Sequence, residues 1–168
     1  MRKALALVGS VVALLSIAVT GASGISRPQT FSVIEIDESD ASTNVGFDFQ
    51  REPKPGDRFA MKSGLYKWAG VKRGARIGYD NVLCTFVRVP TPLTEHSTIT
   101  AHCGGGFHLP GGQSVAEGFI DFSNGPLIAN VPVVGGTGAY GNARGWVHVH
   151  DIGVEDSGHS ALTFHLLP

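Results

Sequence analysis

The chain has 168 residues, enough for one domain with a hydrophobic core. Thirteen basic and fourteen acidic side chains leave it almost neutral, which excludes the excess basic charge of a nucleic-acid-binding protein. Glycine is abundant, at 23 residues, and no long helical periodicity occurs beyond the N-terminal segment. These properties favour a β protein.

The N-terminal segment has the pattern of a secretory signal. Arg2 and Lys3 precede an apolar run over 4–19, and small residues follow over 21–24. A membrane anchor is the alternative, but the run is shorter than the ~20 residues that span a bilayer. We therefore predict a signal peptide over 1–24, a secreted domain over 25–168, and no stable membrane span after cleavage.

The remaining sequence predicts eight short strands separated by turn residues, with no helical crossover. The polar stretch between the first two is expected to be a long loop, with a short extra strand possible over 45–49. This pattern favours an eight-stranded antiparallel barrel, which can close around one small ligand. The predicted strands are Phe31 to Asp37, Arg58 to Trp68, Arg76 to Val89, Ser97 to Leu109, Gln113 to Phe122, Ile128 to Val134, Gly145 to Ile152 and Ser160 to Leu167.

A glycine-rich run over 133–145, VVGGTGAYGNARG, has two incompatible interpretations. Gly136, Gly138 and Gly141 form G-x-G-x-x-G, which binds dinucleotide phosphates when a helix follows it. Here the residues over 146–150 alternate strictly between the two faces of a strand. We therefore interpret the run as a tight turn between two antiparallel strands.

The same run resembles the GGTG-aromatic-x-x-ARG signature of dirigent proteins and the related segment of allene oxide cyclases. FHLPGGQSVAEG over 107–118 resembles a hairpin of secreted actinobacterial proteins with an allene oxide cyclase barrel-like domain. The resemblance implies a barrel of this superfamily, with a cavity for a small apolar or aromatic molecule and no bound cofactor. Relatives form dimers or trimers, so it also implies association into a homo-oligomer.

The resemblance places functional residues on particular positions. Glu35 and Asp37 fall in a segment similar to the E-I-N-E motif of the cyclases, and Arg144 falls in the ARG motif of dirigent proteins. Asp37 stands where the cyclases have asparagine, so the cyclase activity itself is not carried over. These three residues are the predicted catalytic residues, and the predicted ligand-binding residues are Tyr66, Tyr79, Cys84 and Phe86.

The residues themselves leave several roles open. Glu35 shares a strand face with Val33 and Asp37, and that face points either into the barrel or to solvent. A buried Glu35 would have a raised pKa and act as an acid or base. Arg144 has the alternative role of holding the turn by binding carbonyl groups.

Cys84 and Cys103 are the only cysteines, and they are equidistant from a turn near 93–94. An exported protein with one such pair favours a disulfide. A disulfide excludes the alternative role of Cys84 as a reactive thiol in the cavity.

His148, His150 and Glu155 form H-x-H-x-x-x-x-E, similar to the first metal motif of cupins. We predict no metal site, because an exposed strand face opposite Val147 and Val149 explains the same residues.

The sequence thus predicts a secreted barrel that binds a small apolar or aromatic molecule and guides its cyclisation, isomerisation or coupling without a cofactor. The alternative is a ligand-binding or cell-envelope barrel that catalyses nothing.

Overall fold

A computed structural model describes residues 24–38, 43–45, 51–69, 72–123, 125–152 and 159–168. These residues form nine strands in one antiparallel sheet and contain no helix, so no described helix is long and apolar enough to cross a membrane. The strands are β1 (Gln29–Asp37), β2 (Thr43–Val45), β3 (Arg58–Ala69), β4 (Lys72–Arg88), β5 (Ile99–Leu109), β6 (Gly112–Phe122), β7 (Ile128–Gly138), β8 (Arg144–Asp151) and β9 (His159–Leu167).

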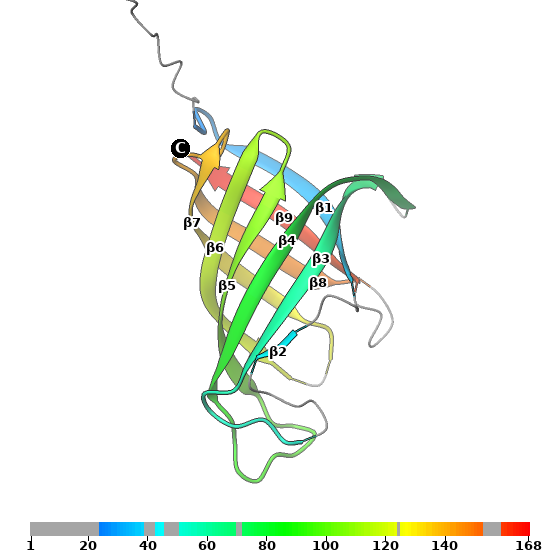
Figure 1. Ribbon diagram of the computed structural model, residues 1–168, viewed down its shortest axis with the longest axis vertical. Helices are drawn as coiled ribbons and strands as arrows, with labels where there is room; N and C mark the ends of the chain where they lie inside the picture. The colour runs from blue at the N-terminus through cyan, green and yellow to red at the C-terminus, as the bar shows by residue number, and fades with distance from the viewer. Residues whose placement is uncertain (1–23, 39–42, 46–50, 70–71, 124, 153–158) are drawn as a thin grey trace, which may run out of the picture.

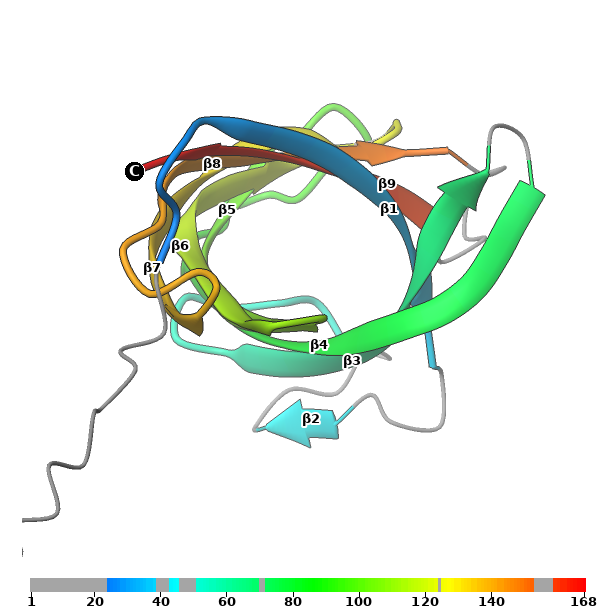
Figure 2. The same cartoon turned by 90° about the horizontal axis from the view of Figure 1, so that it is seen from above.

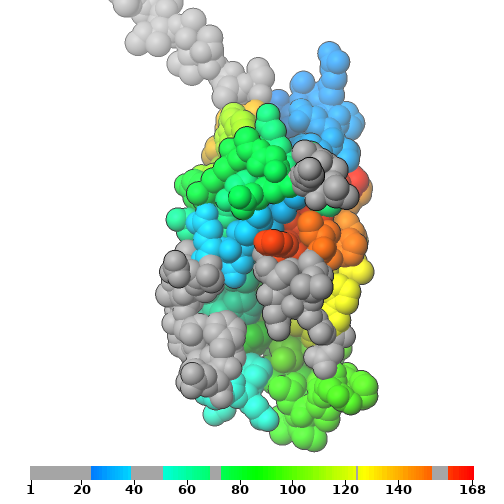
Figure 3. Space-filling model, turned by 90° about the vertical axis from the view of Figure 1, so that its right-hand side faces the viewer, coloured from blue at the N-terminus to red at the C-terminus, as the bar shows by residue number. Residues whose placement is uncertain are grey.

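Eight of these strands close into a barrel, as the sequence predicts. Each strand from β3 to β8 pairs with the next along the chain, and β1 closes the ring by pairing with both β9 and β3. Figure 2 looks down this ring, and Figure 3 shows that the molecule is elongated. The short strand β2 pairs with the start of β3 (Figure 1) and lies outside the ring (Figure 2). It includes Val45, the first residue of the segment 45–49 where the sequence makes an extra strand possible, and residues 46–49 lie outside the described residues.

Alternation along the strands explains where the core lies. On β9, for example, Leu162, Phe164 and Leu166 are buried and point inward. The ring of Phe164 stacks on Phe31 at 4.9 Å between centroids and meets Phe107 edge-on at 5.2 Å. Phe31 also contacts Tyr140, in the β7–β8 turn, at 6.4 Å. These aromatic rings fill the end of the barrel where β1 begins and β9 ends.

The glycine-rich run is a connection between antiparallel strands, not a phosphate loop. β7 ends at Gly138 and β8 begins at Arg144, with β8 folding back along β7. Gly138 has φ +58°, and a Cβ on it would lie 2.2 Å from the carbonyl oxygen of Gly111. Only glycine fits a turn packed so closely against its neighbour.

The run Gly104–Gly105–Gly106 is regular strand, although its composition is typical of a bulge. All three glycines pair in register with β4 and with β6. Irregular pairing occurs elsewhere, between Phe86 and Arg88 and between Val115 and Ala116. Gly105 points inward and lines the cavity, and Val82 packs so closely against it that a side chain would not fit there.

Candidate active site in the barrel

A cavity of about 240 Å³, partly open to solvent, occupies the barrel beyond the aromatic end. Its volume is below the ~300–1,000 Å³ common for drug-sized ligands, so it suits a smaller molecule. Apolar side chains and glycines make up most of its wall, and acids and serines make up the rest. Its lining residues are Glu35, Asp37, Met61, Ser63, Val82, Cys84, Cys103, Gly104, Gly105, Phe107, Ala116, Ile120, Phe122, Leu127, Val131, Val147, Val149, Asp151, Ser160 and Leu162.

Glu35 points into this cavity, which settles the orientation that the sequence leaves open. β1 places Val33, Glu35 and Asp37 on one face, and Val33 is fully buried in the core. Pairing sets Glu35 opposite Leu65 on β3 and Ser160 on β9. Its side chain is only partly buried because it borders the cavity instead of packing against other atoms.

A second buried acid, Asp80 on β4, lies beside Glu35. Asp80 is 0% exposed and pairs in register with Ser63, on the strand next to β1. Glu35 and Asp80 are close enough for a hydrogen bond between their carboxyl groups. Among the described residues no well-aligned hydrogen bond reaches either Asp80 oxygen, although the Ser63 amide and hydroxyl lie close enough to lower the pKa of Asp80.

One shared proton resolves this deficit. Two ionised carboxylates in contact repel each other and can donate nothing, whereas a neutral acid donates to the remaining carboxylate. Burial is the largest influence and raises the pKa of Glu35 to about 7. Burial and the charge of Glu35 raise the pKa of Asp80 to about 9. The pair therefore titrates as a unit, with Asp80 keeping its proton to the higher pH.

Ser63 and two further acids modulate the pair. The Ser63 hydroxyl lies close to both carboxyls and lowers both pKa values, while Asp37 and Asp151 raise the pKa of Glu35 by charge repulsion. Asp37 ends β1, and partial burial raises its own pKa. Asp151 ends β8 and accepts hydrogen bonds from the Leu127 amide at 2.9 Å and the Ser160 hydroxyl at 2.8 Å.

Cys84 and Cys103 form a disulfide across paired positions of β4 and β5, as predicted. Both residues line the cavity. Cys84 therefore borders the cavity as half of a disulfide, and the structure excludes its alternative role as a free thiol.

The structure does not bring the other predicted site residues to the cavity. Tyr66 lies under the Arg73 guanidinium, 4.8 Å from its ring centroid. Tyr79 points outward, because the next residue, Asp80, points inward, and its ring stacks on His108 at 4.1 Å. Phe86 is buried in the core against Phe59, at 5.3 Å, but does not border the cavity.

Arg144 also lies outside the barrel interior. Its guanidinium donates to the carbonyl oxygens of Val134, at 3.2 Å, and Ala143, at 2.8 Å. This is the turn-holding role that the sequence offers as the alternative to catalysis.

His148 and His150 lie on the outer face of β8, opposite the inward-facing Val147 and Val149. His148 bonds to the Asn130 side chain at 2.9 Å. Glu155, the third residue of the motif, is outside the described residues. Within the described part of the chain, no three acidic, histidine or cysteine side chains are placed to hold a metal ion.

Asp80 is the site residue that sequence reasoning misses. It lies two residues before Val82 and four before Cys84, so strand alternation puts it on the same inward face. Its even spacing from Val82 and Cys84 is the sequence signal that would have identified it as an interior acid.

Comparison with known proteins places the fold. The sequence matches no protein-family model and no curated protein at a significant level. Among solved structures, a pyocyanin demethylase is similar at a TM-score of 0.63 and 22% identity, over 83% of this chain and 100% of that chain. An exo-specific intermolecular Diels-Alderase, AbnU, is similar at 0.63 and 15% identity, over 83% of this chain and 97% of that one.

A third similar structure is a nonspecific heme-binding cyclase that catalyses a cycloaddition during neoabyssomicin biosynthesis. It has a TM-score of 0.63 and 16% identity, over 84% of this chain and 65% of that chain. Likeness at such low identity concerns the fold alone. The chain has the small eight-stranded antiparallel barrel, and its finer resemblance to allene oxide cyclases and dirigent proteins stays a prediction.

Proposed function

We propose that the barrel binds a small, mainly apolar or aromatic molecule and catalyses its cyclisation or isomerisation without a cofactor. The observation that carries the proposal is the Glu35–Asp80 pair at the wall of an otherwise largely apolar cavity. The three similar barrels are named for demethylation and cycloaddition of small molecules, which supports a ligand-binding role for this architecture.

Glu35 is the acid–base group in this proposal. Its raised pKa, about 7, provides both protonation states near neutral pH. As a carboxylate it accepts a proton from the bound molecule, while neutral Asp80 donates a hydrogen bond to it. As the resulting acid it returns the proton to another atom of the same molecule. The proton is conserved over the cycle, so no co-reactant is required.

The apolar wall contributes by confinement. Val147, Val149 and Ile120 exclude water and restrict the conformations of a bound molecule, which lowers the entropic cost of ring closure. We assign the barrel a redox-neutral rearrangement, because the radical coupling guided by dirigent proteins needs an external oxidant. Asp37 acts through its charge, which helps keep the pKa of Glu35 raised.

Mass spectrometry of molecules retained by the purified protein provides the substrate, and turnover of that substrate tests the role of Glu35. We expect Glu35→Gln to bind the molecule and to convert it at least about 100-fold more slowly. Glu117→Gln is the matched control, because Glu117 is exposed on the outer face of β6. Undiminished turnover by Glu35→Gln would leave a binding protein without chemistry.

We also propose that the protein is exported. The disulfide between Cys84 and Cys103 agrees with an oxidising compartment. The predicted signal covers residues 1–24, of which 1–23 lie outside the described residues. The mass of the protein recovered from culture medium tests the proposal, with loss of about 21–24 residues expected and an intact N-terminus contradicting it.

A further inference from the structure

The charged residues that line the cavity all have the same sign. Glu35, Asp37 and Asp151 border the ligand space, and Asp80 lies directly behind Glu35. Among the described lining residues there is no lysine, arginine or histidine. Glu38, the residue after Asp37, forms an ion pair with Arg76 at 2.5 Å. Neither residue of this pair lines the cavity.

The Glu35–Asp80 pair supplies a second observation, because it has few hydrogen-bond donors once it loses its protons. A fully buried carboxyl normally has hydrogen-bond donors for its oxygens. Asp80 is 0% exposed and points inward, no well-aligned hydrogen bond reaches either of its oxygens, and the donors nearby are the amide and hydroxyl of Ser63. Its own proton and that of Glu35 satisfy the pair only while the pair stays protonated. A cationic donor in the cavity satisfies Glu35 without that restriction.

We infer that the cavity selects a ligand with an apolar body and a protonated amine, held by Glu35 with Asp37 and Asp151 around it. The inference rests on the proposed ligand-binding function and specifies its ligand class. The apolar part of the wall, including Val147 and Ile120, receives the body of such a ligand. The three acids receive its ammonium group, whose positive charge offsets their mutual repulsion.

The same charges disfavour a ligand that carries a carboxylate. An anion in this cavity would meet three acids and no described basic side chain. Burial strengthens that repulsion, because the surroundings screen charge less than water does. The cavity is thus poorly suited to a free fatty acid, although its wall is apolar.

Three probes with one body and different end groups test the inference. Tryptamine ends in an ammonium, 3-ethylindole in a methyl group and indole-3-acetate in a carboxylate. We expect isothermal titration calorimetry at pH 8 to show tryptamine binding at least about tenfold more tightly than 3-ethylindole, with indole-3-acetate weakest. Tryptamine binding no more tightly than 3-ethylindole would overturn the inference.

The pH dependence of binding identifies the group that holds the amine. Because Glu35 ionises as the pH rises through about 7, tryptamine affinity should increase between pH 6 and pH 8, while 3-ethylindole affinity stays constant. The titratable groups facing Glu35 are Asp37 on β1, Asp80 on β4 and Asp151 on β8; the other described strands bring no titratable side chain to the lining.

A variant with its control locates the preference. In Glu35→Gln the affinity for tryptamine should fall to about the affinity for the neutral probe, 3-ethylindole. Circular dichroism checks that the variant is folded. Asp121→Asn should keep it, because Asp121 is an exposed acid bonded to Thr100 outside the cavity. An unchanged preference in Glu35→Gln would overturn the inference. The proposed function fails separately, by undiminished turnover in that variant.

Discussion

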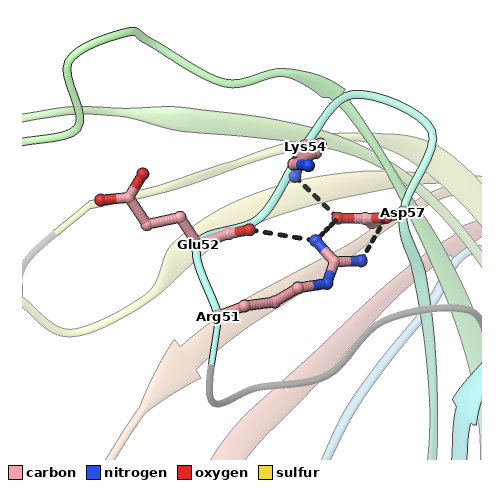
Figure 4. A network of polar contacts seen from close by, with 4 residues as sticks. All are labelled: Arg51, Glu52, Lys54 and Asp57. Carbon is pink, nitrogen blue, oxygen red and sulfur yellow. Dashed lines mark hydrogen bonds and ion pairs between the residues drawn. The ribbon is translucent and has the colours of Figure 1, made fainter.

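Asp57 and the Glu35–Asp80 pair are acids in opposite electrostatic surroundings, one beside a cation and the other without one among the described residues that line its cavity. Asp57, before β3, is held by the Arg51 guanidinium, with nitrogen–oxygen distances of 2.7 and 2.8 Å, and by the Lys54 amide at 2.7 Å (Figure 4). The same guanidinium donates to the Glu52 carbonyl at 3.1 Å. Glu35 and Asp80 lie inside the barrel, where no described cation lines the cavity.

Their pKa values depart in opposite directions for this reason. The hydrogen bonds from Arg51 lower the pKa of Asp57, so this acid stays ionised at any neutral pH. Burial raises the pKa of Glu35 and Asp80, so these acids change charge within the physiological range. The Arg51–Asp57 pair fixes a loop, whereas the buried pair is able to exchange a proton.

The largest expected effect is the pH dependence of stability that the buried pair imposes. Unfolded, the two carboxyls ionise near 4.5 and 3.8; folded, they keep protons up to about 7 and 9. The stability they contribute is therefore complete below about pH 4 and is lost as pH rises through 7 and 9. Each proton kept only by the folded state lowers the free energy of unfolding by about 1.4 kcal/mol per pH unit.

Glu35→Gln with Asp80→Asn should remove this slope, because amides keep the shape and do not titrate. Urea unfolding at several pH values between 5 and 9 measures it. Glu117→Gln with Asp121→Asn makes the same two changes outside the cavity and should leave the slope intact. Equal slopes in the parent and the interior variant would contradict the shifted pKa values.

The disulfide is a reference for the buried acids, because it lies in the same cavity wall and does not titrate. It closes a loop between positions 19 residues apart, and its loss should cost about 3 kcal/mol of unfolding free energy. The cost in Cys84→Ala with Cys103→Ala should be equal at pH 5 and pH 9. A cost that changes with pH would show that packing at the wall, and not ionisation alone, controls the slope of the pair.

The strands and their closure into a barrel could be predicted from the sequence. Alternation and turn residues are local properties, and they locate β1, β5, β6 and β9 to within a few residues. Counting outward from the turn near 93–94 also places Cys84 opposite Cys103. The glycines at 104–106 show the limit of composition, because a glycine run is compatible with both a bulge and a regular strand.

The site could be predicted only in part, because it is assembled across strands. Glu35 lies in a segment that resembles a family motif, so the sequence alone indicates it. Asp80 becomes a site residue only because it contacts Glu35, 45 positions away in the chain. Tyr66 and Tyr79 lie on the same strands as interior residues, yet strand alternation turns Tyr79 outward. Which residues share a cavity depends on register, and that is known only once the strands are paired.

A smaller effect is expected from Ser63, the hydroxyl beside the pair. Ser63 is 3% exposed and lowers both pKa values. Ser63→Ala should raise the pKa of Glu35 by about 1 unit, the equivalent of one hydrogen bond to a charged group. Carboxyl carbon NMR across pH 5–9 measures it. A fall in the pKa would mean that Ser63 stabilises the protonated form instead.

The smallest effect should come from the Arg51–Asp57 pair. Arg51→Gln removes the charge that lowers the pKa of Asp57, so its cost appears only where Asp57 is ionised, above its ordinary value of 3.8, and disappears as the pH falls. Melting temperatures at pH 7 and pH 3 measure the difference.

Salt separates the two groups further: 1 M NaCl should reduce the cost of Arg51→Gln, because charges near the surface are screened, and leave the slope of the buried pair almost unchanged. A slope of the buried pair that collapses in salt would place Glu35 and Asp80 in contact with bulk solvent, and the argument for a proton held inside the barrel would fail.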